Sequence, residues 1–197
     1  MNIILLFGCA AILPSLFAFG QEGSTSKPKV EHAIVTKTQP GLLPSESFST
    51  WIAKPVTEVA FKDLQGNEWS ISKLRGKVIY LNFWFTGCAP CVKEIPDLNA
   101  IHARFSDNPD LVMLSLAYDD ESKLREFLKK SPINFPVACI PFDVLKKLAM
   151  PTSNIGFPTH LIIDRSGNLL IASSGGSAQT SKDLEYSMNQ ALKKQQP

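Results

Sequence analysis

Hydrophobic and polar positions along this chain change their periodicity several times, and the changes predict a succession of strands and helices. An almost continuous apolar run over 78–85 is typical of a central strand buried on both faces, and a second such run spans 111–118. Between them, apolar side chains recur at helical spacing over 92–105, where Pro96 is expected to bend the helix. These three elements form the expected centre of the fold.

Shorter elements flank this centre. We expect a β-hairpin from strands at 56–61 and 68–71, helices at 122–130 and 142–150, strands at 135–139, 159–163 and 169–172, and a final amphipathic helix at 181–194. Strands that alternate with helices and end in a hairpin plus helix describe an α/β fold. The predicted architecture is a mixed central sheet flanked by helices, with an N-terminal β-hairpin extension.

The first twenty residues are mostly apolar and carry no charged side chain, which predicts a secretory signal peptide at 1–20. Ala18-Phe19-Gly20 places small residues where signal peptidase reads them, which predicts cleavage before Gln21. No Lys or Arg follows Met1, so the alternative is an uncleaved leader that tethers the protein. Residues 21–50 are rich in Ser, Thr, Lys, Gln and Pro and are expected to be a flexible linker, followed by one domain at 51–197. The expected location is exported, in the periplasm or cell envelope.

Charge and cysteine content restrict the functional classes. The net charge is +2 with no basic or acidic block, so nothing indicates nucleic acid as a partner. Four cysteines are present, and Cys9 would leave with the leader. Of the remaining three, Cys139 stands alone and is expected to be a buried, inert thiol.

Cys88-Ala89-Pro90-Cys91 lies between the first apolar run and the helix that follows it. Two thiols at this spacing can form and break a disulfide, and a sulfur beside the first N–H groups of a helix is favoured as thiolate. This makes Cys88 the expected nucleophile. The same spacing occurs in zinc sites, but the chain offers no second Cys or His pair to complete four ligands.

Two stretches resemble exported thioredoxin-like proteins of the TlpA/ResA group. The first is Asn82-Phe83-Trp84-Phe85-Thr86-Gly87-Cys88-Ala89-Pro90-Cys91-Val92-Lys93-Glu94-Ile95-Pro96, and the second is Phe157-Pro158-Thr159 with Leu161-Ile162-Ile163-Asp164 and Gly167 after it. The resemblance covers the chain from about Trp51 onward and implies a thioredoxin-like fold. It also implies that Pro158 is a cis-proline facing the two sulfurs, with Phe157, Pro158 and Thr159 binding the substrate.

The resemblance also assigns a role to Glu94, which matches a glutamate of that group. On a helix Glu94 would share a face with Cys91 and could exchange protons with the second thiol; the alternative is a solvated helix carboxylate.

Asn82 stands where cytosolic thioredoxins have a buried aspartate, and its amide cannot exchange protons at neutral pH. Gly87 replaces a frequent tryptophan, so one wall of the substrate groove is expected to be missing. His160 reads as a strand residue on one sheet face.

These features predict an exported thiol-disulfide oxidoreductase that reduces protein disulfides through Cys88 and Cys91, with no cofactor and no metal. The expected partners are exported proteins with disulfides or thiols, including apocytochrome c, and a membrane electron donor. One alternative is a copper chaperone that binds Cu(I) through both thiolates and His160. Others are a disulfide oxidase or isomerase. A peroxidase of the peroxiredoxin type is disfavoured because Thr86 lies too close to Cys88.

Overall fold

The computed structural model describes residues 46–148, 156–176 and 178–194. All of them belong to the compact unit Val35–Pro197. The expected leader at 1–20, its cleavage site and nearly all of the expected linker lie outside the described residues. Within the described part of the chain, no helix combines the length and the apolar character needed to cross a bilayer.

The centre of the fold is a five-stranded mixed sheet in the order β5-β4-β3-β6-β7. Its strands are β3 (Val78–Trp84), β4 (Leu111–Ala117), β5 (Val137–Cys139), β6 (Thr159–Ile163) and β7 (Leu169–Ser174). The pairs β3–β4 and β4–β5 are parallel, whereas β3–β6 and β6–β7 are antiparallel. Every residue of β3 is buried, as the continuous apolar run predicts for a central strand.

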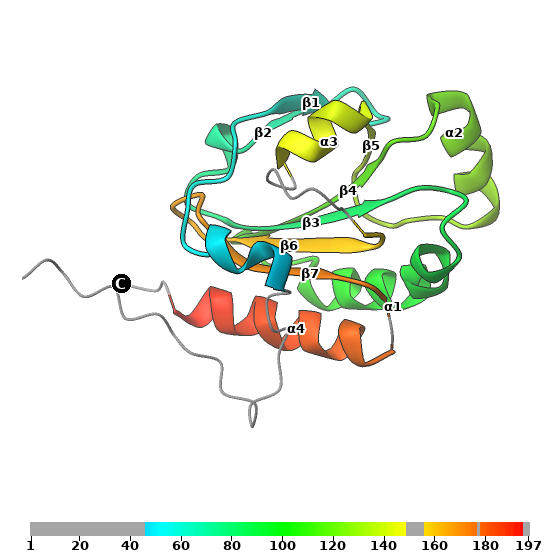
Figure 1. Cartoon of the computed structure of the whole chain (residues 1–197). Helices are drawn as coiled ribbons and strands as arrows, with labels where there is room; N and C mark the ends of the chain where they lie inside the picture. Colours follow the sequence, from blue (N-terminus) through cyan, green and yellow to red (C-terminus); the bar gives the residue numbers. More distant parts are fainter. Residues whose placement is uncertain (1–45, 149–155, 177, 195–197) are drawn as a thin grey trace, which may run out of the picture. The chain divides into compact units, whose positions relative to one another are not determined.

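Helices cover both faces of this sheet (Figure 1). They are α1 (Ala89–Phe105), α2 (Glu121–Lys130), α3 (Phe142–Leu148) and α4 (Ala178–Lys193). Alternate β3 residues Val78 and Tyr80 pack with Leu98 of α1 and Leu184 of α4. The other β3 face packs against α3. Because side chains alternate across a strand, one apolar run supplies both cores.

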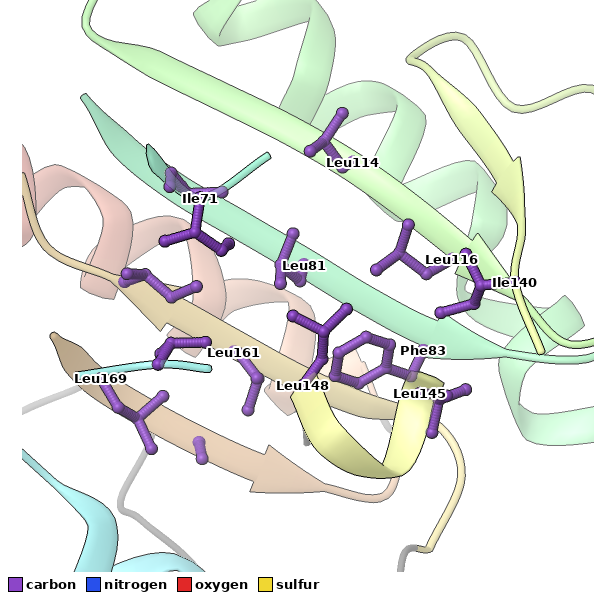
Figure 2. Close-up of a cluster of buried hydrophobic side chains, with 14 of the residues drawn as sticks. Ile71, Leu81, Phe83, Leu114, Leu116, Ile140, Leu145, Leu148, Leu161 and Leu169 are labelled. Carbon is purple, nitrogen blue, oxygen red and sulfur yellow. The ribbon is translucent and has the colours of Figure 1, made fainter. Parts of the chain in front are cut away.

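Figure 2 shows the core between the sheet and α3. Leucine, isoleucine and phenylalanine side chains from the strands meet those of the helix, with Leu81, Phe83, Leu114, Leu116, Leu161 and Leu169 from the sheet, Ile71 and Ile140 from connecting segments, and Leu145 and Leu148 from α3. Burying a side chain of this size contributes about 1.5–3 kcal/mol. This core fixes β3 and β6, the two strands that lead to the site described below.

A two-stranded antiparallel sheet of β1 (Ala60–Lys62) and β2 (Glu68–Ser70) confirms the predicted hairpin. Its turn is held by Asp63, whose carboxylate accepts hydrogen bonds from the backbone of Gln65 and Asn67 and from Trp69 Nε1. Ahead of it lies a 3-10 helix, Glu46–Trp51, in which Phe48 is only 1% exposed. Core packing therefore already includes Phe48, N-terminal to the expected domain start at 51.

Element boundaries differ from the sequence pattern mainly at their ends. β1 is shorter than expected, because Pro55 instead bridges to Asn168 and Val56 donates its N–H to Gly167. α1 begins at Ala89 and continues through Pro96. The last two residues of the helix expected at 142–150 lie outside the described residues. The mixed α/β architecture and its element order are as predicted.

Candidate active site

Cys88 and Cys91 are joined by a disulfide bond at the start of α1. Cys88 is the N-cap residue, and its Sγ accepts a hydrogen bond from the Cys91 backbone N–H at 3.3 Å. Pro90 lies in the first helical turn, where its missing N–H costs nothing. The unpaired N–H groups and the dipole of the helix favour negative charge at this position, so the structure suits a Cys88 thiolate. Cys91, 1% exposed, lies behind it.

The loop before β6 lies against the first turn of α1. The Phe157–Pro158 bond is cis, as the resemblance implies, and the Pro158 carbonyl accepts a hydrogen bond from Gly175 N–H. A Cβ atom on Gly176 would lie 2.9 Å from Glu94 Oε2, 3.1 Å from Pro158 Cγ and 3.4 Å from the Pro90 carbonyl oxygen. Only glycine fits here without displacing a neighbour. The segment after β7 therefore closes the site together with α1 and the Pro158 loop.

Glu94 is buried, with 5% of its surface exposed, and so is not a solvated helix carboxylate. Its Oε2 lies 3.4 Å from His160 Nε2, and the other ring nitrogen of His160, Nδ1, lies 2.9 Å from the Tyr80 hydroxyl. Burial, with a further contribution from the Glu94 charge, raises the pKa of Tyr80 well above its ordinary value, so the phenol keeps its proton. Three ionisable side chains from α1, β6 and β3 thus meet at Glu94, one helical turn after Cys91.

The sequence pattern placed His160 correctly on a strand but did not reveal this group. Alternation along β3 puts Tyr80 and Asn82 on one face, and this can be predicted from the sequence. The register that pairs His160 with Asn82 cannot be predicted in this way, because β3 and β6 are far apart in the chain. The one indication in the sequence was His160 itself, a polar residue within an apolar strand.

Aromatic side chains pack against the cluster that contains the dithiol. The rings of Phe85, Tyr118 and Phe157 form mutual contacts, with centroid separations of 5.1–5.5 Å. A Cβ atom on Gly87 would lie 3.3 Å from the Phe85 ring. The Phe85 ring therefore lies beside Gly87, the position where a tryptophan is frequent.

The segment just before Cys88 is anchored by Asp119, which follows β4. Thr86 donates to its carboxylate through both the backbone N–H, at 2.6 Å, and the hydroxyl, at 2.7 Å, and Lys123 Nζ lies 2.8 Å away. Burial alone would raise the pKa of Asp119, but the hydrogen bonds from Lys123 and Thr86 outweigh it and hold this pKa below its ordinary value. Asp119 thus positions the chain that enters α1.

We expect Asp119→Asn to lower the free energy of unfolding by about 2 kcal/mol at neutral pH, because hydrogen bonds to a charged acceptor are lost. The carboxyl pKa is lowered on folding, so its stabilisation is fully present above the ordinary value of 3.8 and is lost as pH falls through the lower folded value. The difference between variant and wild type should therefore shrink in acid. Urea unfolding at pH 7 and at about pH 3 measures the difference in unfolding free energy between variant and wild type. An equal difference at both pH values would contradict the stabilising role of the Asp119 carboxylate.

Cys139 is a free cysteine at the end of β5, and its thiol donates to the Asp119 carbonyl. Burial, together with the charges of Glu121 and Asp119, raises the pKa of this thiol. It therefore keeps its proton at neutral pH, as expected for an inert cysteine. The expectation that Cys139 is buried is wrong, because the residue ends the edge strand β5 and is only half-buried. Across the described residues, no three His, Cys, Asp or Glu side chains are grouped so that they could hold a metal ion.

Comparisons with known proteins agree with this geometry. The model of the AhpC/TSA family matches residues 52–171. Thiol-disulfide oxidoreductase ResA of a Bacillus cereus strain is 31% identical over 135 residues, which cover 68% of this chain and 75% of that protein. ResA of Geobacillus kaustophilus is 25% identical over 142 residues, covering 72% and 78%.

Solved structures share the fold. A thiol:disulfide interchange protein of the thioredoxin family from Chlorobium tepidum TLS superimposes with a TM-score of 0.59 at 23% identity, covering 70% of this chain and 95% of that one. A thiol:disulfide interchange protein from a Bacteroides species gives a TM-score of 0.59 at 22% identity, covering 73% and 94%. With the family match and the ResA relatives, the helix-capping dithiol identifies the chain as a member of the AhpC/TSA family and a thiol-disulfide oxidoreductase of the thioredoxin type.

Proposed function

We propose that this protein is an exported reductase of protein disulfides, in which Cys88 attacks and Cys91 resolves. The observation that carries the proposal is the Cys88–Cys91 pair at the first turn of α1. The helix terminus favours a thiolate on Cys88, the N-cap residue, which is 5% exposed, whereas Cys91 lies within the first helical turn and is 1% exposed. This asymmetry separates the two roles.

The chemistry proceeds in two exchanges. The Cys88 thiolate attacks a partner disulfide, forming a mixed disulfide and releasing one partner sulfur as thiolate, which takes up a proton. Cys91 then attacks Cys88 Sγ; the Cys88–Cys91 bond forms, the bond to the partner breaks, and the second partner sulfur leaves. Two electrons pass from the dithiol to the partner. No cofactor takes part in these steps, because the cysteines carry the electrons.

Glu94 would serve as the base for the second exchange. It lies three residues after Cys91 on α1, so the two side chains share a helix face. The Cys91 thiol must lose its proton before it can attack, and its burial leaves few groups able to receive that proton. The Glu94 carboxylate takes the proton and later returns it to the departing sulfur.

The loop Phe157-Pro158-Thr159 would bind the partner chain. The backbone N–H and C=O of Phe157 make no hydrogen bond with any described residue, and an extended peptide added like a strand would bond to them. Thr159 contributes indirectly: its hydroxyl is buried and bonds Gly156 and Ser174, which holds the loop. The aromatic rings of Phe85 and Phe157 border the place where such a peptide would lie.

The apolar leader at 1–20 supports export, and exported proteins with disulfides or thiols are the proposed substrates. The resemblance to the TlpA/ResA group and the similarity to ResA proteins support apocytochrome c thiols as one substrate class. After each turnover a membrane electron donor would restore the dithiol.

The reductase direction rests on Ala89-Pro90 between the cysteines. This dipeptide lacks the histidine that stabilises the thiolate in strongly oxidising motifs, so the reduced form gains less stability. We expect a reduction potential nearer to thioredoxin's value of about −270 mV than to about −120 mV for DsbA. Equilibration with glutathione or dithiothreitol, followed by thiol labelling, measures it. A value more positive than about −180 mV would assign the protein as an oxidase or isomerase instead.

A further inference from the structure

Three buried polar groups contact one another in series, and the last of them, Glu94, follows Cys91 by three residues on α1. Tyr80, Glu94 and His160 are each less than a tenth exposed, and they come from β3, α1 and β6 (Figure 1). His160 stands between the other two: its Nδ1 faces the Tyr80 hydroxyl at 2.9 Å and its Nε2 faces Glu94 Oε2 at 3.4 Å. Buried polar groups of this kind need an explanation, because most are satisfied by a partner.

The Tyr80 phenol determines which nitrogen of His160 carries a hydrogen. Its raised pKa keeps it protonated, and His160 Nδ1 is the acceptor within reach of its O–H. If the phenol donates to Nδ1, the neutral imidazole carries its hydrogen on Nε2. The opposite tautomer would set the Nε2 lone pair against the Glu94 Oε2 lone pairs, which repel. The favoured arrangement therefore has Tyr80 donating to His160 Nδ1 and the Nε2–H directed to the side of Glu94 Oε2, 3.4 Å away.

The two oxygens of Glu94 then differ. Oε2 lies 3.4 Å from His160 Nε2, which is an ion-pair contact and not a formed hydrogen bond, and it lies against Gly176. Neither His160 Nε2 nor the buried Glu94 Oε1 has a hydrogen-bond partner among the described residues. An acceptor left open in this way suits a donor that exists only in the other redox state. The Cys91 thiol is such a donor, because its hydrogen is absent while the disulfide is formed.

We propose that His160 is a positioning residue for the second exchange: with its tautomer fixed by Tyr80, it holds Glu94 Oε2 and leaves Oε1 to take the Cys91 proton. The proposal rests on the proposed role of Glu94. The proton moves from Cys91 Sγ to Oε1, the Cys91 thiolate attacks Cys88 Sγ, and the departing partner sulfur is protonated. Tyr80 and His160 keep their protons throughout and exchange none with the substrate.

The titratable groups packed around Glu94 are few. Among the described residues they are His160 from β6, Tyr80 from β3 and, three residues away on either side in α1, Cys91 and Asp97, while residues 175–176 contribute only glycine. Asn82 lies beside His160 in the strand register, but its amide does not titrate. Loss of the His160 donor should therefore act on the pH dependence of one step, the step that needs the Glu94 carboxylate.

The test measures that step alone. In a background without Cys9 and Cys139, the reduced protein is mixed with dithiobis(nitrobenzoate); Cys88 releases a first thionitrobenzoate and Cys91 then releases a second. We expect His160→Leu to move the pH of the half-maximal second-phase rate upward by about one pH unit, because a carboxylate without its donor takes up protons more readily. His160→Gln, which retains an N–H donor, should restore the wild-type profile, and Tyr80→Phe should give a smaller upward shift.

Controls separate this proposal from a loss of packing and from the role of Glu94. Ser181→Ala removes a part-buried hydrogen bond from α4 to Asp97 of α1, the helix that carries Glu94, and should leave the profile unchanged. If His160→Leu shifts the profile no more than Ser181→Ala, or if His160→Gln shifts it as much as His160→Leu, the positioning role is wrong. If Glu94→Gln itself leaves the second phase unchanged, the proposed base is wrong. Should His160→Leu fail to fold, Tyr80→Phe decides: no upward shift contradicts the proposal.

Discussion

Replacing Cys88 by Ser is expected to reduce the rate of disulfide exchange to the uncatalysed background. The attacking sulfur is lost, and a serine hydroxyl beside the helix terminus is not a nucleophile toward sulfur at neutral pH. Cys91 is not expected to substitute for it, because Cys91 is not the N-cap residue and is 1% exposed, against 5% for Cys88. Insulin reduction in the presence of dithiothreitol measures the rate.

The matched variant is Cys91→Ser, which has the same chemical change three residues further on. It should keep the first exchange and lose turnover, since the mixed disulfide is no longer resolved. Cys139→Ser controls for general loss of a thiol and should retain wild-type turnover, because Cys139 is held by the Asp119 carbonyl. Substantial turnover by Cys88→Ser would refute the assigned nucleophile.

Glu94→Gln is expected to slow the second exchange by about 10²-fold at neutral pH, which is the usual contribution of a positioned base. The first exchange should be nearly unchanged, because Cys88 has the helix terminus beside it and does not need Glu94. Gln has almost the same shape as Glu, so the fold should persist. Single-turnover kinetics with dithiobis(nitrobenzoate) separate the two exchanges.

The control for this variant is Glu126→Gln, the same change at an exposed position of α2 where the carboxylate pairs only with Lys130 among the described residues. It should leave both exchanges unaltered. Equal slowing of the first and second exchanges by Glu94→Gln would point to a distorted site and would argue against a base that acts on Cys91.

Much of this site could be predicted from the sequence because its chemistry is local. Cys88 and Cys91 lie within one helical turn, and the apolar run ahead of them places them at the end of a strand. Glu94 follows at helical spacing. The mixed sheet likewise followed from the alternation of strand and helix patterns, and the comparisons confirm it.

The remainder depends on strand register and loop packing, which periodicity does not encode. His160 reaches Glu94 only because β6 pairs antiparallel to β3 and sets it beside Asn82. Gly176 lies outside any strand or helix, and its need for a small residue appears only when α1 and the Pro158 loop are both in place. Phe48 does not belong to a periodic pattern of apolar residues, so its burial in the core could not be predicted from the sequence either.

Trapping with the Cys91→Ser variant tests the central claim most directly. Oxidised exported proteins are mixed with the reduced variant, thiols are blocked, and the covalent complexes are digested and analysed by mass spectrometry. The account predicts mixed disulfides at Cys88, released by dithiothreitol and absent from the double variant with Cys88→Ser. Partner disulfides found on Cys139, or the same yield from the double variant, would contradict it.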